Sequence, residues 1–179
     1  MSLIPTASQT VGPFFNFALT TNASLGVLAR DGAKGERIFL SIRVVDGAGA
    51  PAPGDAMIEL WQADAQGCYA HADPNFSGFG RLETDLNGCC TFETIKPGCV
   101  ANGSAPHINV IVLARGLLKQ LYTRIYFADD PANANDPVLA LVPEDRRSTL
   151  LAKPIHGEDN TWSIEIRLQG EAETVFFDL

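Results

Sequence analysis

An alternation of apolar and polar residues with a period of two is the feature that most constrains the fold of this 179-residue chain. In the segment Arg37 to Asp46, the side chains of Ile38, Leu40, Ile42 and Val44 would share one face of a strand. Short strands that recur at this frequency predict a β-sandwich. The other segments with a strand signal are 55–64, 89–95, 107–114, 120–129, 161–169 and 174–177.

Turn residues separate these segments. Asp46-Gly47 closes the first strand, Asn87-Gly88 is typical of a hairpin turn, and Gly116 joins two further strands. Helical signals are convincing only from Pro143 to Leu151, where the early acidic residues suit a helix N-terminus. The expected fold is all-β: an antiparallel β-sandwich with long loops and one short helix.

The first 30 residues lack regular periodicity. They contain Pro5, Pro13, Phe14 and Phe15, and an apolar arm of this kind often packs on a neighbouring chain. The alternative is a loop that covers its own sheet. We therefore divide the chain into residues 1–30, an arm expected to pack on a partner, and residues 31–179, a single β-sandwich domain.

Composition excludes several classes of function. A net charge of −8 and a pI near 4.7 disfavour nucleic acid and anionic membranes as partners. No apolar run approaches a membrane span, and the N-terminus lacks a signal-peptide pattern. A cytoplasmic protein is the expectation. In that compartment the four cysteines would be free thiols, and we expect all four to act as small apolar side chains in a sheet.

Four segments together suggest an incomplete metal-binding site. They are WQADAQGCY (61–69), PNFSGFGR (74–81), KPG (96–98) and PHIN (106–109). The last reads as the start of a strand, where residues i and i+2 share a face. A His-x-His sequence there would direct two imidazoles at one metal, but this chain has His107 followed by Asn109.

These segments, in this order, resemble the intradiol ring-cleaving dioxygenases. The resemblance runs from SQTVGPFF (8–15) to QGEAETVFFDL (169–179). The catalytic beta chains of this family hold Fe(III) with two tyrosines and two histidines. By motif, Tyr69 matches the first tyrosine and His107 the first histidine. No tyrosine occurs at 99–105, where the second would fall, and Asn109 replaces the second histidine.

The resemblance therefore implies a chain that holds no metal itself. It is similar to the alpha subunits of the family, and Tyr69, His107 and Asn109 would be vestigial ligand positions. The implied partner is a homologous beta subunit that binds the Fe(III). The implied reaction is cleavage of protocatechuate by O2 to 3-carboxy-cis,cis-muconate, with no catalytic residue in this chain alone.

Arg115 is the main candidate for contact with substrate. It follows an apolar strand and precedes Gly116, and a guanidinium binds a carboxylate through two parallel hydrogen bonds. Protocatechuate carries such a carboxylate, and the resemblance places the arginine of the LARG segment (113–116) near it. The alternative is a surface arginine paired with an acid of its own chain.

Thr10, Gly12 and Pro13 form the second candidate element. Glycine allows close approach of the backbone to a ligand, and proline fixes the chain direction. The resemblance implies that this segment lines the pocket that opens to the iron of the partner. An ordinary turn within a packing arm is the alternative.

The remaining candidates have mainly structural interpretations. Tyr69 and His107 are expected to form a buried, hydrogen-bonded pair. Arg81, Arg124 and Tyr126 lie in family-like motifs, and we expect them to pair with acidic side chains.

Three functions stay open at this point. The preferred one is a non-catalytic alpha subunit that completes an active site in trans. The second is an independent dioxygenase with an altered metal site. The third is a β-sandwich binding module, since fold alone does not fix function.

Overall fold

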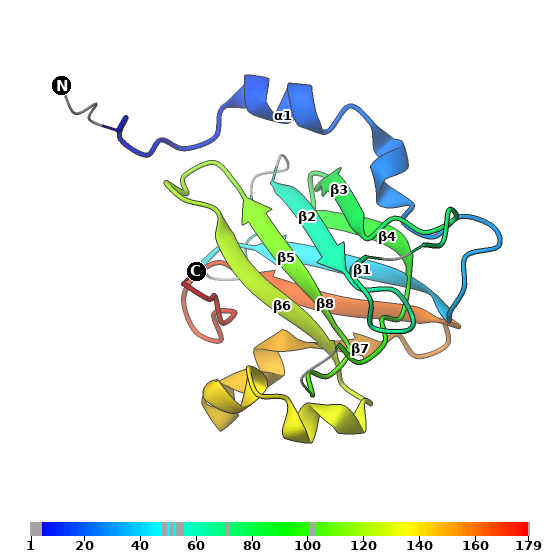
Figure 1. Ribbon diagram of the computed structural model, residues 1–179. Coiled ribbons are helices and arrows are strands. Elements are labelled where there is room, and N and C mark those ends of the chain that lie inside the picture. Colours follow the sequence, from blue (N-terminus) through cyan, green and yellow to red (C-terminus); the bar gives the residue numbers. More distant parts are fainter. Residues whose placement is uncertain are drawn as a thin grey trace.

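The computed structural model describes residues 5–47, 50, 52, 56–70, 72–100 and 103–178. Eight strands form one hydrogen-bonded arrangement in the order β3-β2-β5-β6-β7-β8-β1-β4, and β7 joins two layers of strands (Figure 1). The strands are β1 (Arg37–Val45), β2 (Met57–Gln62), β3 (Phe79–Glu83), β4 (Cys89–Ile95), β5 (His107–Leu113), β6 (Leu121–Phe127), β7 (Leu151–Pro154) and β8 (Thr161–Arg167).

The all-β sandwich expected from the sequence is confirmed, with one amendment. Strand pairing is mixed, because β1 pairs with β8 and β6 pairs with β7 in parallel, while the other pairs are antiparallel. Period-two alternation contains no information about strand direction, so the sequence pattern could not reveal these two parallel pairs.

The core lies between the two layers. The inward face of β1 contributes Ile38, Leu40, Ile42 and Val44, all fully buried. Equivalent side chains of the other layer include Leu60 of β2. The alternation read from the sequence therefore does produce a buried face, which drives formation of the sandwich.

Several local expectations were wrong. The segment 174–177 forms only an isolated bridge, between Tyr122 and Phe177, and the prediction missed β3 and β7. Asn87-Gly88 is a turn, with Gly88 at a φ of 76°. It does not close a hairpin, because β3 pairs with β2 and β4 pairs with β1.

The helical segments also differ from the prediction. The segment expected as the one short helix is a 3-10 helix, η5 (Glu144–Leu150). Within the described residues the one α-helix is α1 (Pro13–Leu19), inside the arm that was expected to be irregular. The other 3-10 helices are η1 (Ala23–Gly26), η3 (Pro131–Asn135) and η4 (Leu139–Leu141).

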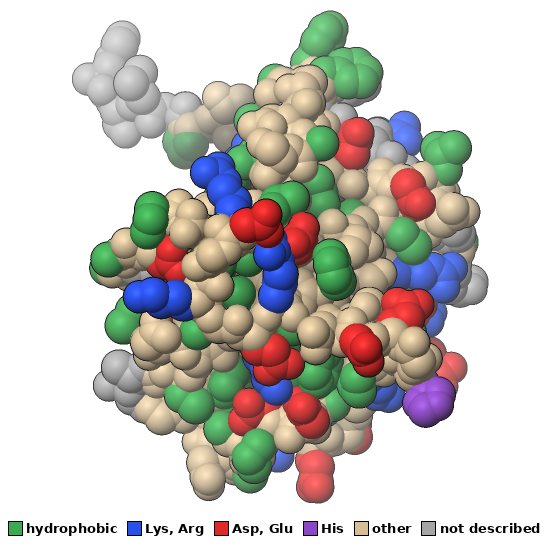
Figure 2. Space-filling view, turned by 90° about the vertical axis from the view of Figure 1, so that its right-hand side faces the viewer, with side chains coloured by type: hydrophobic (Ala, Val, Ile, Leu, Met, Phe, Trp, Pro, Cys, Tyr) green, Lys and Arg blue, Asp and Glu red, His purple; other side chains and the backbone are tan. Residues whose placement is uncertain are grey.

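The N-terminal region divides into two parts. Leu28 and Ala29 are buried in the core, and the backbone N–H of Leu28 donates to the carbonyl of Glu93. Residues from η1 onward thus pack on the sandwich. In contrast, α1 lies apart above the strands in Figure 1, and hydrophobic side chains protrude at the same height in Figure 2. Phe14 and Phe17 are 88% and 66% exposed.

The cysteines follow the prediction only in part. All four are free thiols, and Cys89 and Cys90 lie in β4. Cys68 and Cys99, however, are exposed and lie outside the strands, so they do not act as apolar side chains of a sheet.

Candidate functional site

The three residues that the resemblance matched to ligand positions, Tyr69, His107 and Asn109, lie together near the start of β5. The hydroxyl of Tyr69 is 3.3 Å from Nε2 of His107, and Nδ2 of Asn109 donates to that hydroxyl at 2.9 Å. His107 and Asn109 share a face of β5, as the spacing predicts. The second imidazole position is therefore filled by an amide that binds the tyrosine.

The partners of His107 show which atom is the donor and which the acceptor in each of its hydrogen bonds. A backbone carbonyl can only accept, so Nδ1 of His107 donates to the carbonyl of Ala105 at 2.8 Å. Nε2 is then the acceptor, and the Tyr69 hydroxyl donates to it. Burial lowers the pKa of His107, and the nearby positive charge of Arg124 acts in the same direction. The imidazole is neutral, and its lone pair is used by the tyrosine.

A buried acid supports this cluster. Asp136 is 1% exposed and accepts hydrogen bonds from the backbone N–H groups of Ala105, Val138 and Leu139 at 2.7 to 2.9 Å. The hydroxyl of Tyr126 also donates to it, at 3.1 Å. Burial raises the pKa of Tyr126 to about 12. The expected pairing of Tyr126 with an acid is confirmed, and it holds the loop that positions His107.

This cluster does not fit a ferric ion. The resemblance implied a ferric site of two tyrosines and two histidines, whereas here one oxygen and one nitrogen of that type are present, and they bind each other. Asn109 presents an N–H group, a donor rather than a ligand, to Tyr69. Across the described residues, no group of three or more His, Cys, Asp or Glu side chains could hold a metal.

The other predicted site residues meet at the opposite end of β5. Arg115 is exposed in the turn between β5 and β6, and the next backbone N–H, of Gly116, donates to the hydroxyl of Thr10 at 2.8 Å. Gly116 has a φ of 93°, which favours glycine. The structure thus brings together two segments that are 106 residues apart in sequence.

After Thr10 the chain passes through Gly12 into α1. Gly12 is exposed, with open space where a Cβ would lie, and its carbonyl accepts the N–H of Phe15 at 3.0 Å. Pro13 begins α1, but its side chain lies outside the described part of the chain. The observed link between the arm and the Arg115 turn is therefore the bond between Thr10 and Gly116.

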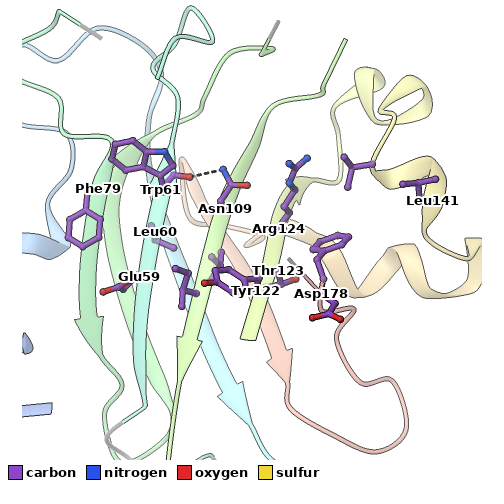
Figure 3. A pocket seen from close by; sticks show the side chains of 14 residues that line it. Glu59, Leu60, Trp61, Phe79, Asn109, Tyr122, Thr123, Arg124, Leu141 and Asp178 are labelled. Atoms are coloured by element: carbon purple, nitrogen blue, oxygen red, sulfur yellow. Dashed lines mark hydrogen bonds between the residues drawn. The ribbon is translucent and has the colours of Figure 1, made fainter. Parts of the chain in front are cut away.

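A groove of about 620 Å³ lies on the outer face of the layer formed by β3, β2, β5 and β6 (Figure 3). Its walls are mainly apolar. Its lining residues are Glu59, Leu60, Trp61, Phe79, Asn109, Val110, Ile111, Tyr122, Thr123, Arg124, Val138, Leu141, Phe177 and Asp178.

Most of these groove residues were not predicted as site residues. Trp61 and Phe79 do lie in motif segments, and Trp61 is the outward residue of a strand whose neighbours Leu60 and Gln62 are buried. An exposed tryptophan in such a strand is the one sequence signal that could have indicated the groove.

The two arginines of this face differ. Arg81 lies 2.6 Å from a carboxylate oxygen of Glu59, so its expected pairing with an acid is confirmed. For Arg124 that expectation was wrong: among the described residues no carboxylate lies within ion-pair distance of its guanidinium, which instead donates to the Tyr126 hydroxyl at 3.5 Å.

Comparisons with known proteins agree with this geometry. The family model described as Dioxygenase matches residues 11–170. The chain therefore belongs to the dioxygenase family, of the intradiol ring-cleaving type.

Within the family, the chain is similar to protocatechuate 3,4-dioxygenase alpha chains. It is 41% identical to that of Burkholderia cepacia over 99% of both chains. Identity to that of Pseudomonas putida is 42%, over 99% of this chain and 98% of the relative. The beta chain of B. cepacia is 35% identical over 81% of this chain and 64% of its own length.

Solved structures support the fold. The dioxygenase domain of a carbohydrate-binding fusion protein from Streptomyces sp. SirexAA-E has a TM-score of 0.65 and 25% identity, covering 96% of this chain and all of that one. The 3-chlorocatechol 1,2-dioxygenase of Rhodococcus opacus 1CP has a TM-score of 0.64 at 22% identity, over 93% of this chain and 68% of that one. No helix in the described part of the chain is long and apolar enough to span a membrane.

Proposed function

We propose that this chain is the non-iron-binding alpha subunit of a protocatechuate 3,4-dioxygenase. It would assemble with a homologous beta subunit that holds Fe(III), and together they would cleave protocatechuate with O2 to 3-carboxy-cis,cis-muconate. Near full-length similarity to alpha chains, and lower similarity to a beta chain, support this proposal.

One observation carries the proposal. The atoms that would bind iron, the Tyr69 hydroxyl and Nε2 of His107, are hydrogen-bonded to each other, and Asn109 completes the set. A chain of this family with its own ligand positions closed in this way can serve ring cleavage through a partner that supplies the metal. The iron of that partner would provide the oxygen chemistry.

The role of this chain would lie at the Arg115 end of β5. Arg115 and the segment Thr10, Gly12 and Pro13 would form a wall of the substrate pocket. The exposed guanidinium would bind the carboxylate of protocatechuate through two parallel hydrogen bonds. The bond from Gly116 to Thr10 supports this arrangement, since it joins the arm to the arginine turn.

The arm would also anchor the partner. Residues 1–30 are the proposed partner-packing region, and within it α1 presents the exposed rings of Phe14 and Phe17. Exposed aromatic side chains of this kind are frequent anchors in protein interfaces. We place the assembly in the cytoplasm, where the four free thiols would remain reduced.

Co-expression with a beta chain tests the proposal. We expect the two chains to co-purify with one ferric ion per pair, and a visible tyrosinate-to-iron band that this chain alone lacks. Iron and colour in this chain by itself would favour the altered-metal-site enzyme instead. Failure to associate with any beta chain, with no iron, would leave the independent binding module.

A further inference from the structure

The groove contains an ordered row of side chains across three neighbouring strands. Trp61 of β2 is paired with Asn109 of β5, and Asn109 is paired with Arg124 of β6. Paired residues of adjacent strands project from the same face at a spacing of about 5 Å. An indole, an amide and a guanidinium therefore lie side by side along about 10 Å of the sheet (Figure 3).

Arg124 provides positive charge at one end of this row. Among the described residues its contact is the neutral hydroxyl of Tyr126, 3.5 Å away. Glu59 in the neighbouring row is already bound by Arg81. Figure 3 shows the Arg124 guanidinium pointing away from Asp178, which lies below it on the same side of the groove. An anion could approach this arginine without displacing a described carboxylate.

Trp61 provides a flat apolar surface at the other end. Trp61 is 47% exposed and lines the groove, and Tyr69 stacks on its ring with an interplanar angle of 14° and a centroid distance of 6.1 Å. Because Tyr69 is held by His107 and Asn109, the orientation of the indole is supported from behind. A ring bound against Trp61 would meet a surface that is already in place.

We propose that this groove binds a small aromatic carboxylate, with the carboxylate on Arg124 and the ring over Asn109 toward Trp61. The row offers one cation and one aromatic face at the separation that such a molecule spans. A volume of about 620 Å³ is within the range of small-molecule sites. The groove lies on a sheet face, where backbone groups are already paired in strands, so recognition here depends on side chains.

This inference concerns residues of the chain itself and does not depend on the proposed function. The chain can be titrated alone with benzoate, by calorimetry and by tryptophan fluorescence. We expect one saturable site with a dissociation constant below about 10 mM. Arg124→Gln should weaken binding about 10- to 100-fold, whereas Arg124→Lys should weaken it less because the charge remains.

Two matched controls distinguish this site from general attraction to positive charge. Arg167→Gln, in the other layer where Arg167 pairs with Glu165, should leave benzoate binding unchanged. Benzyl alcohol, which has the ring without the carboxylate, should bind at least about 10-fold more weakly to the wild-type chain. Thermal melting of each variant verifies that it is folded.

The site must also remain open in the assembled complex. With a beta chain present, we expect a benzoate site that Arg124→Gln removes and Arg167→Gln does not. The proposal is overturned by absence of saturable binding to the free chain, by equal binding to the Arg124→Gln variant, or by loss of the site on assembly. Loss of the site on assembly would show that the beta chain covers the groove. It would not contradict the proposed function.

Discussion

The two ends of β5 use polar side chains in opposite ways. At its start, Tyr69, His107 and Asn109 satisfy one another, and Asp136 binds the adjoining backbone. At its end, Arg115 is exposed in a turn that is tied to the N-terminal arm. The same strand thus carries a closed hydrogen-bonded cluster and an open, charged edge.

Under the proposed function, the start of β5 is structural and its end contributes to an active site. At the start of β5, the polar atoms of Tyr69 and His107 are hydrogen-bonded within the protein, so these side chains have a structural role. At the opposite end, Arg115 is exposed and, under the proposed function, would contact the substrate. The predictions below alter one end at a time, from the largest expected effect to the smallest.

Restoring the second imidazole should open the closed end to metal. In Asn109→His, two imidazoles and the Tyr69 oxygen would face one point, and Tyr69 and His107 are already 3.3 Å apart. We expect Zn²⁺ or Co²⁺ to bind with a dissociation constant below about 0.1 mM, roughly 5.5 kcal/mol. Calorimetry measures this directly, with Asn87→His in an exposed turn as the control. Binding that persists after adding Tyr69→Phe would exclude this geometry.

Removing the buried acid should destabilise the closed end. Asp136→Ala leaves the N–H groups of Ala105, Val138 and Leu139 without their acceptor. We expect the free energy of unfolding to fall by about 3 kcal/mol. Urea denaturation tests this, with the exposed Asp159→Ala as the comparison; similar losses in both variants would show that Asp136 has no special role.

Removing the charge of Arg115 should weaken substrate binding and leave folding unchanged. In an alpha–beta complex, Arg115→Ala should raise KM for carboxylated catechols about 10- to 100-fold, equivalent to about 1.5–3 kcal/mol, with a smaller change in kcat. Steady-state kinetics measure both constants. A catechol without a carboxylate serves as the control substrate, and its KM should hardly move. Unaltered kinetics on protocatechuate would remove Arg115 from the pocket.

The stability of the protein should also depend on pH through His107. Burial holds the pKa of His107 below its ordinary value of 6.5. Below that pH the unfolded chain therefore takes up a proton that the folded chain resists, and stability decreases as pH falls. We expect the contribution of this group to stability to be lost progressively as the pH falls below 6.5. The pH dependence of unfolding should be shallower in His107→Gln and unaltered in the exposed His156→Gln.

The exposed arm should contribute little to the stability of the chain itself. Phe14→Ser should change the free energy of unfolding by less than about 0.5 kcal/mol, because Phe14 is 88% exposed. Association with a beta chain should nevertheless weaken, measurable by analytical ultracentrifugation. Leu86→Ser is a matched control, since Leu86 is also 88% exposed but lies outside the arm. Equal effects of the two on association would argue against α1 as an anchor.

Sequence reasoning succeeded where the pattern is local. The alternation of Ile38, Leu40, Ile42 and Val44 predicted the buried face of β1, and the residues at 107 and 109 shared a face as their spacing required. It failed where pairing partners decide the outcome. The turn at Asn87-Gly88 has hairpin residues, yet the strands on either side pair in different layers.

The sequence by itself determined the class of fold, because period-two alternation recurs along the chain, and it showed an asparagine at 109 where a second histidine would complete a His-x-His pair. Only the tertiary structure decided which contacts these residues make. The bond from Asn109 to Tyr69, the contact between Thr10 and Gly116, and the row from Trp61 to Arg124 each join segments distant in sequence. Their proximity depends on strand order and register, which no local pattern encodes.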